Sequence, residues 1–405
     1  MPGALMQLVA YGAQDIYLTG QAQITFFKVV YRRHTNFSME SIEQTFNGQA
    51  DFGKRVTATI SRNGDLIGRV YLQVDLPTVT KTGGTFAWAR YIGHVLIQDV
   101  EVQIGGQRID KHYGDWLTIW SELTLPEEKR FGFFNMIGET SDLTTLATTI
   151  NGKTLYIPLQ FWFNRNCGLA LPLIALQYHE VKFEINFRSL ADCWISDDGN
   201  APDATPQLGI ASLWVDYIFL DTDERRRFAQ VSHEYLIEQL QFTGDESINN
   251  TNVKIRLNFN HPSKELIWIS QLDSVIDGAT AKNIDGNEWA NYTDAAGFAG
   301  SNTMIDAKIQ LNGHDRFTTR KAAYFNLVQP YQHHTRIPSN GIYVYSFAIK
   351  PEEHQPSGSV NFSRIDNATL LMTMASNADQ KVRIYCVNYN VLRIMSGMGG
   401  LAYSN

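Results

Sequence analysis

The sequence predicts an all-β protein built from two similar antiparallel β-sandwiches or barrels. Apolar and polar residues alternate along many short segments that are separated by turns containing Gly and Asn, and this period of two is typical of strands with one buried face. Motifs of the first half return in the second half in the same order. Because the strands do not alternate with helices, a parallel sheet is disfavoured.

Four short motifs indicate an internal duplication. Ile42-Glu43-Gln44 returns as Ile237-Glu238-Gln239, Asp65-Leu66-Ile67 as Glu265-Leu266-Ile267, Val102–Arg108 as Ile309–Arg316, and Val215–Leu220 as Val387–Leu392. The stretch Leu213–Phe228 lies where the first copy ends and the second begins. We therefore predict a hinge there, with Arg225-Arg226-Arg227 in a solvated linker.

The length of 405 residues is long for one core, since domains commonly have roughly 100 to 200 residues. We expect an N-terminal arm at 1–23, a first domain at 24–221, a second at 222–395 and a C-terminal tail at 396–405. The arm contains three glycines and is predicted to be extended. Its apolar side chains should lie across its own body or a neighbour's. The glycine-rich tail is predicted to be mobile.

The strand pattern is clearest at 69–76, where Val70, Leu72, Val74 and Leu76 alternate with polar residues. The same alternation recurs at 99–104, 181–187 and 254–259. Turn signals between strands include Asn47-Gly48, Asn63-Gly64, Gly105-Gly106, Asn151-Gly152 and Asn312-Gly313. These segments are predicted to be half-buried antiparallel strands.

Helices and long loops interrupt this pattern in a few places. A helix is predicted at about 113–123, where Trp116, Trp120 and Leu123 share a face, and a second should start at 124–127, where Thr124 and Glu127 have capping-box spacing. Both are expected to decorate a loop. Polar stretches at 78–86, 192–208 and 274–304 are predicted excursions, the last forming a surface tower.

Charge and cysteine content exclude several classes of protein. Acidic residues outnumber basic ones by 41 to 34, and the net charge of -7 disfavours direct binding to a genome. Three widely spaced cysteines form neither a disulfide framework nor a zinc pattern and fit a reducing compartment. The sequence shows no signal peptide, and its longest apolar run, Leu169–Leu176, is far below the roughly 20 residues that cross a bilayer.

The motif search predicts no catalytic residue, no cofactor and no metal. Gly152-Lys153-Thr154 lacks the first glycine of a phosphate loop and is interpreted as a hairpin turn, while His333-His334 are adjacent and therefore poor co-ligands. Carboxylates and aromatics are nevertheless plentiful. A jelly-roll enzyme or lectin acting on carbohydrate is therefore the alternative function.

Five asparagines begin N-glycosylation sequons: Asn36, Asn249, Asn291, Asn361 and Asn367. Without a signal peptide, unmodified sequons are the favoured interpretation. Asn291 and Asn249 are the candidate sites, and Asn291 is preferred because its loop is expected to be the most exposed.

Several longer motifs resemble a known family. They are Met6–Gly20, Thr25–Lys28, Tyr31–Phe37, Ile104–Trp116, Phe163–Asn166, Ser357–Asn367 and Asn388–Tyr403. These segments look like the major capsid proteins of nucleocytoplasmic large DNA viruses, especially those of algal viruses. The resemblance implies a double jelly roll, two eight-stranded antiparallel β-sandwiches side by side with short helices in loops. It also implies homotrimers with a pseudo-hexagonal outline that tile an icosahedral shell.

The resemblance further implies partners and a location. Neighbouring capsomers and minor capsid and penton proteins would be partners, the internal membrane only indirectly, and nucleic acid not directly. The protein would form the outer shell of the virion after assembly in the host-cell cytoplasm, without catalytic residues. The arm would lie at the capsomer base, where Leu5, Leu8, Val9 and Tyr11 would bury against neighbours. A penton or minor capsid protein is disfavoured, because pentons usually have one jelly roll.

Overall fold

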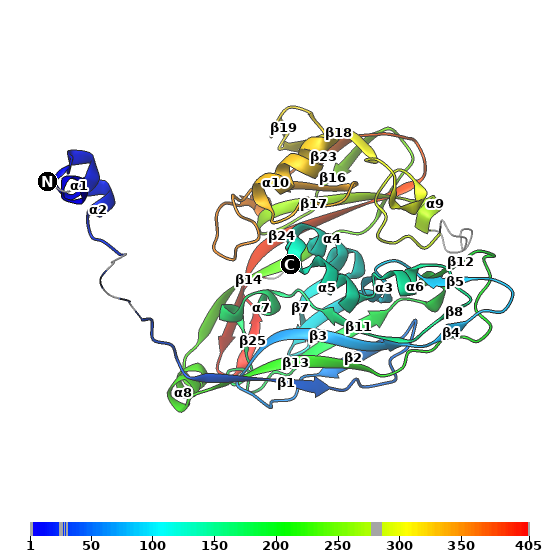
Figure 1. The fold of residues 1–405 in the computed structure, drawn as a ribbon, viewed down its shortest axis with the longest axis horizontal. Helices are drawn as coiled ribbons and strands as arrows, with labels where there is room; N and C mark the ends of the chain where they lie inside the picture. The colour runs from blue at the N-terminus through cyan, green and yellow to red at the C-terminus, as the bar shows by residue number, and fades with distance from the viewer. Residues whose placement is uncertain (1–2, 24–26, 28, 30, 277–285, 404–405) are drawn as a thin grey trace. The chain divides into compact units, whose positions relative to one another are not determined.

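The computed structural model describes residues 3–23, 27, 29, 31–276 and 286–403. It divides into two compact units, residues 1–37 and 38–405 (Figure 1). The larger unit contains the predicted first domain from residue 38 onward and the whole predicted second domain. Every strand pairing described in it is antiparallel.

The first half contains two main sheets, and in one of them two short strands share the fourth place beside the same neighbouring strand. One has the order β1 (Phe37–Gln44), β13 (Ala211–Leu220), β3 (Leu66–Leu76), followed by β9 (Lys153–Pro158) and β10 (Leu171–Pro172), which pair with different parts of β3. The other has the order β2 (Arg55–Thr59), β11 (Val181–Phe187), β6 (Ile97–Ile104), β7 (Gln107–Tyr113). There are also two short pairs, β4 (Val79–Thr80) with β8 (Thr149–Ile150) and β5 (Phe86–Trp88) with β12 (Trp194–Ser196). Of these strands, β4 and β12 lie in the predicted excursions at 78–86 and 192–208.

The second half repeats this strand order. One sheet runs β14 (His233–Phe242), β24 (Gln380–Met395), β17 (Pro262–Leu272), then β21 (Ile342–Ser346) and β22 (Val360–Asn361). Its partner runs β16 (Asn252–Arg256), β23 (Ala368–Met374), β18 (Met304–Leu311), β19 (His314–Asp315). Three short strands are added: β15 (Glu246–Ile248), β20 (Arg320–Lys321) and β25 (Met398–Leu401). Each half therefore has eight strand positions, and the predicted double jelly roll is confirmed.

The predicted duplication is confirmed at the level of single strands. The four repeated motifs fall on equivalent strands: β1 and β14, β3 and β17, the β6–β7 and β18–β19 hairpins, and β13 and β24. Gly105-Gly106 and Asn312-Gly313 form the two equivalent hairpin turns, and all four residues have positive φ, from 49° to 83°. Glycine and asparagine tolerate this backbone conformation, which explains why they mark the turns.

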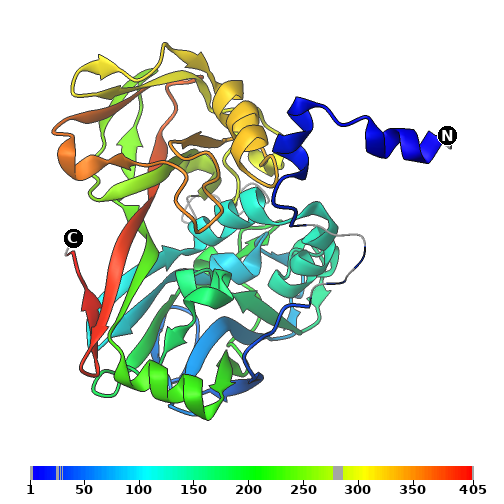
Figure 2. The same cartoon turned by 90° about the vertical axis from the view of Figure 1, so that its left-hand side faces the viewer.

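The predicted alternation of apolar and polar residues identifies which side chains are buried in the cores. In β3 the side chains of Val70, Leu72 and Val74 are at most 1% exposed, whereas Arg69 is exposed. One apolar cluster fills the first half and a second fills the other. Ile237 of β14 and Leu392 of β24 belong to the first cluster, because these long strands extend alongside the first half (Figure 2).

The helices of the described chain are short. They are α1 (Gly3–Val9), α2 (Ile16–Thr19), α3 (Ile92–Leu96), α4 (Gly114–Thr124), α5 (Glu127–Ile137), α6 (Ser141–Thr144), α7 (Trp162–Arg165), α8 (Thr222–Gln230), α9 (Asp273–Ile276) and α10 (Gln329–His333), with a π-helical turn at Tyr324–Val328 before α10. The predicted solvated linker is α8, which joins β13 to β14 and has no buried residue, whereas the first part of the predicted hinge, residues 213–220, belongs to β13. Arg225 of this helix pairs with Asp65, Nε to Oδ1 2.9 Å.

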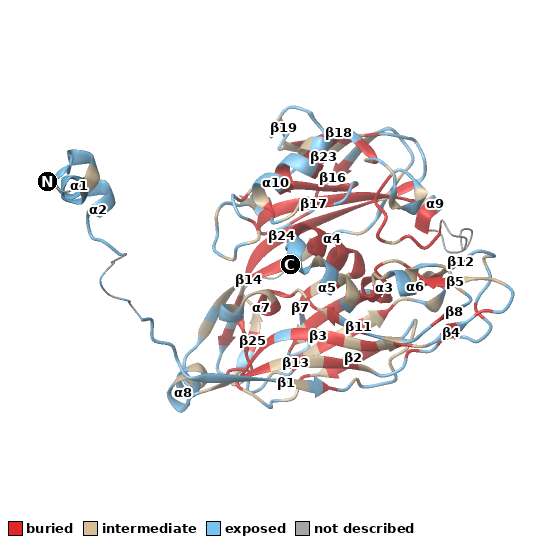
Figure 3. Cartoon of the chain, in the orientation of Figure 1, coloured by how far each residue is buried: buried red, intermediate tan, exposed pale blue. Residues whose placement is uncertain are grey.

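The two predicted helices exist, but the setting of the first was predicted wrongly, whereas α5 is mostly exposed with only Phe133 and Ile137 buried. Ten consecutive residues of α4 are buried, so this helix lies inside the molecule rather than on a loop (Figure 3). The capping box is also absent. Thr124 Oγ1 donates to the Trp120 carbonyl 2.8 Å away, which ends α4, and Pro126 takes the N-cap position of α5 without a side-chain bond.

Both chain ends differ from their predictions. The arm was predicted to be extended, but it contains α1 and α2 because segments such as Ala4–Leu8 consist of good helix formers. The tail was predicted to be mobile, but β25 pairs with the end of β24. Ser396 and Gly397 have φ of 52° and 80°, which gives the tight turn that lets the chain reverse and complete these hydrogen bonds.

The predicted tower at 274–304 is wrong for residues 286–293, whereas residues 294–301 are exposed or half-buried and residues 277–285 lie outside the part that the structure describes. Residues 286–293 are buried, apart from the half-buried Trp289. The Asn287 amide donates to the Ala191 and Trp194 carbonyls at 2.9 and 2.7 Å, and Trp289 Nε1 donates to the Asp192 carbonyl at 2.8 Å. These bonds tie the segment to the first half.

Candidate functional site

Helix α4 is the apolar centre of the junction between the halves. Trp116 and Trp120 are four residues apart and therefore share a face, with ring centroids 5.5 Å apart. This face packs against second-half residues that include Ile267, Tyr292 and Tyr385. The two halves are thereby joined through a shared core.

A buried ion cluster on β24 reinforces this junction. Arg383 binds Asp115 of α4 in the first half and Asp245 of the second, with its Nε 2.9 Å from Asp245 Oδ1. Burial by itself would lower the pKa of Arg383, but the Asp115 and Asp245 carboxylates outweigh burial and raise it. The guanidinium therefore stays charged and bridges the halves.

A second ion cluster surrounds Glu238 of β14. Its carboxylate lies 2.8 Å from Arg165 Nη2 of α7 in the first half and 2.6 Å from Lys264 Nζ of β17. Burial would raise the pKa of Glu238, but the charges of Arg165 and Lys264 and a contact from His354 lower it to about 2. Burial lowers the pKa of Lys264 despite this carboxylate.

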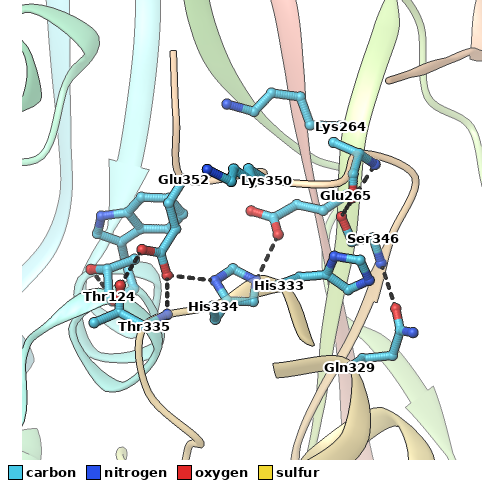
Figure 4. A network of polar contacts seen from close by, with 12 residues as sticks. Thr124, Lys264, Glu265, Gln329, His333, His334, Thr335, Ser346, Lys350 and Glu352 are labelled. Carbon is cyan, nitrogen blue, oxygen red and sulfur yellow. Dashed lines mark hydrogen bonds and ion pairs between the residues drawn. The ribbon is translucent and has the colours of Figure 1, made fainter. Parts of the chain in front are cut away.

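A third cluster lies in the second half, around His334 just after α10 (Figure 4). Its Nε2 is 2.9 Å from Glu265 Oε2 and its Nδ1 is 2.9 Å from Glu352 Oε1. Burial would lower the pKa of His334, but the two carboxylates outweigh burial and raise the pKa to about 9. Sequence reasoning missed this cluster, because Glu265 and His334 belong only to separate motifs and Glu352 to none, and the three residues lie far apart in the chain.

The motifs set aside in the sequence have structural roles. Gly152 N donates to Thr78 Oγ1 in the turn before β9, but the predicted hairpin is wrong, since β8 pairs with β4 and β9 pairs with β3. His333 directs Nδ1 to the Ile349 carbonyl while His334 binds carboxylates, so the two do not converge. The two histidines lie at the C-terminal end of α10. Among the residues that the structure describes, no cluster of His, Cys, Asp and Glu suits a metal ion.

Two further observations concern the chain as a whole. Cys167 is exposed, Cys193 and Cys386 are buried, and all three are free thiols. Within the described ranges no helix is both long and apolar enough to span a bilayer.

The arm presents the four predicted contact residues on and just after α1. Leu5, Leu8, Val9 and Tyr11 are 48, 79, 71 and 61% exposed. Tyr17 of α2 is 88% exposed and was not singled out from the sequence, although an aromatic residue in an apolar arm is itself a signal. A group of large apolar side chains in water is typical of a surface that is covered by a partner.

The two candidate glycosylation sites differ in exposure. The expectation that Asn291 is the most exposed is wrong, since it is 0% exposed and its amide donates to Glu288 Oε2 at 2.6 Å and to the Ala295 carbonyl at 2.8 Å. Asn249 follows β15 and is exposed. Asn249 stays a candidate.

Comparisons with known proteins cover nearly the whole chain. Residues 25–221 match the family model "Major capsid protein N-terminus", and residues 224–400 match "Large eukaryotic DNA virus major capsid protein". The major capsid proteins of Pyramimonas orientalis virus and Phaeocystis pouchetii virus are 57 and 50% identical, with both chains covered completely in each case.

A solved structure shows the same fold. The crystal structure of PBCV-1 VP54 matches with a TM-score of 0.80 and 44% identity, covering 94% of this chain and all of VP54. Its likeness extends over both sandwiches, as do the two family matches. The chain therefore belongs to the family of major capsid proteins of large eukaryotic DNA viruses.

Proposed function

We propose that the protein forms homotrimers with a pseudo-hexagonal outline, which tile the outer shell of an icosahedral virion. The observation that carries this proposal is the repeated strand order, β1–β13–β3 in one half and β14–β24–β17 in the other. Three copies of a chain with two similar lobes give six lobes around a threefold axis. Closed symmetry of this kind limits each capsomer to a defined size.

The junction supports the proposal mechanically. The shared core around α4 and the buried bridge from Arg383 to Asp115 fix the two lobes of one chain against each other. A tile whose lobes keep a fixed geometry can repeat across a flat shell face. We propose 24–221 and 222–395 as the limits of the two lobes.

The arm supplies a further contact in this proposal. Its exposed Leu5, Leu8, Val9 and Tyr11 would bury against neighbouring capsomers or against minor capsid and penton proteins. Assembly would take place in the host-cell cytoplasm, with the membrane involved only indirectly. The role is structural, without catalysis and without direct contact to nucleic acid, in keeping with the net charge of -7.

The mass in solution tests the trimer. The subunit is 45.8 kDa, so light scattering after size-exclusion chromatography should give three times that mass. A protein that stays monomeric at high concentration would contradict the proposal. A trimer that does not bind to preformed shells or to other trimers would support the proposed homotrimer. It would contradict the proposal that these trimers pack side by side in the shell.

A further inference from the structure

The contacts of His334 define its protonation state. Both ring nitrogens lie 2.9 Å from carboxylate oxygens, Nε2 from Glu265 and Nδ1 from Glu352 (Figure 4). A carboxylate only accepts hydrogen bonds, and a neutral imidazole has one N–H to donate. Both bonds therefore form together only when the ring is the doubly protonated imidazolium.

The surrounding charges also require a cation at this position. The side chains of His334 and Glu265 are both 0% exposed, and a buried carboxylate needs a charged partner. The charged and titratable groups nearby lie on five parts of the second half. They are Lys264 and Glu265 on β17, Glu238 on β14, Cys386 and Tyr389 on β24, His333 on α10 with Arg336 after it, and Lys350, Glu352, Glu353 and His354 between β21 and β22.

The other cations of this group are directed to different anions. The charge of Glu265 acts to raise the pKa of Lys264, but Lys264 Nζ makes its close contact with Glu238 Oε1, 2.6 Å away. Arg336 binds Glu122 at 2.8 Å, and Lys350 binds Glu353 at 2.9 Å. His334 is thus the cation in direct contact with Glu265.

The histidine also anchors the segment that follows β21. Glu352, which His334 binds, accepts from the Thr335 backbone N–H at 2.8 Å and from its hydroxyl at 2.5 Å. The backbone carbonyl of the next residue, Glu353, accepts a hydrogen bond from Lys264 Nζ at 3.3 Å. His354 Nδ1 then lies 3.4 Å from Glu238 Oε1. Glu353 is therefore bonded directly to β17, Glu352 is connected to β17 through His334, and His354 lies beside β14.

This attachment extends to the first half. The Glu238 carboxylate binds Arg165 of α7 in the first half and lies 3.4 Å from His354 Nδ1 of this segment. The segment that His334 holds therefore lies beside a group that also holds the junction.

We propose that His334 is a proton-controlled latch: the imidazolium ties residues 350–356 to β17, and loss of its proton releases this segment. The pKa of His334, raised to about 9, sets the pH range of the release. A group whose pKa is higher in the folded than in the unfolded state stabilises the fold fully below the unfolded value, about 6.5 for histidine. That stabilisation is lost as the pH rises through 9.

Cleavage by a Glu-specific endoprotease tests the latch in the full-length, assembled protein. The bonds after Glu352 and Glu353 should be protected at pH 7, and the cleavage rate should rise about tenfold or more by pH 9.5 as the deprotonated fraction grows. A free peptide of sequence 350–356, cleaved in parallel, corrects for the pH dependence of the protease. A corrected rate that does not change between pH 7 and 9.5 would overturn the proposal.

Three variants assign the transition to His334. His334→Gln should abolish it, because the titrating group is gone. Glu352→Gln should shift its midpoint down by about one pH unit, because one anion is lost and the new amide can donate to a neutral ring. His333→Gln is the matched control and should leave the transition unchanged, since His333 Nδ1 bonds the Ile349 carbonyl and not a carboxylate.

The variants also separate the latch from Lys264, whose pKa is lowered by burial. A transition that persists in His334→Gln would assign it to another group and contradict the proposal. If His334→Gln does not fold, the wild-type protein and Glu352→Gln decide the matter, because an unshifted midpoint in Glu352→Gln is equally incompatible with the latch.

Discussion

The ring of Trp116 in α4 lies 5.5 Å from the ring of Tyr385 in β24, centroid to centroid, and both side chains are buried. Residues from the two halves of the chain thus share one apolar core. The lobes are joined by side-chain packing, in addition to the exposed α8 that connects them in sequence.

Removing the Trp116 ring should weaken this core. Trp116→Ala is expected to lower the free energy of unfolding by about 3 to 5 kcal/mol, because a large side chain is lost from a packed site. Chemical denaturation measures the change. Phe131→Ala is the control, since Phe131 of the neighbouring α5 is 82% exposed and its removal should cost little. Equal effects of the two substitutions would refute the role assigned to α4.

Replacing Glu238 should unbalance a buried ion cluster. Glu238→Ala leaves Arg165 and Lys264 facing each other without their anion, and we expect a loss of about 3 to 5 kcal/mol in stability. Glu234→Ala on the same strand is the control, because its side chain is 60% exposed and pairs with Arg393 at the surface. Thermal and urea denaturation at neutral pH compare the two variants.

The same residue should contribute to acid sensitivity. The pKa of Glu238 is lowered to about 2, so its stabilisation is present above the unfolded value of about 4.3 and is lost as the pH falls through 2. The stability difference between wild type and Glu238→Gln should therefore shrink between pH 5 and pH 2. A difference that stays constant over this range would show that the charge of Glu238 does not stabilise the fold.

The arm should affect assembly more than folding. Deleting residues 2–20 is expected to leave the melting temperature of the body unchanged while shell assembly fails, because the exposed apolar side chains of α1 lose their partners. Electron microscopy of particles and a melting curve give the two measurements. Leu8→Ser should reproduce part of the defect, whereas Gln7→Ser on the same helix should not. Normal particles from the truncated protein would eliminate the assembly role.

Exposure should decide which sequon can be modified. In a host that attaches N-glycans to this protein, Asn249 is expected to carry a glycan and Asn291 is not, because the Asn291 amide is buried and bonded to Glu288. Peptide mapping by mass spectrometry distinguishes the two sites. A glycan on Asn291 would require that its segment open before or during modification.

Much of the fold could be predicted from the sequence because its information is local. Alternation at Val70, Leu72 and Val74 identifies a strand and its buried face without knowledge of the partner strand. Gly105 and Asn312 mark equivalent hairpins because their backbone requires positive φ. The repeated motifs likewise identify equivalent strands, and the longer motifs identify the family.

The tertiary structure alone decided what surrounds each element. The sequence placed Trp116 and Trp120 on one helical face, but only the packing of two distant segments shows that this face fills the junction. The residues around Asn291 have the composition of an exposed loop. In the structure, however, Asn291 is buried and its amide donates to the Ala295 carbonyl of the same loop. His334, Glu265 and Glu352 form one buried cluster that no motif predicts. The physical reason is that periodicity and turn chemistry act between neighbours in the chain, whereas burial and charge pairing depend on residues that only folding brings together.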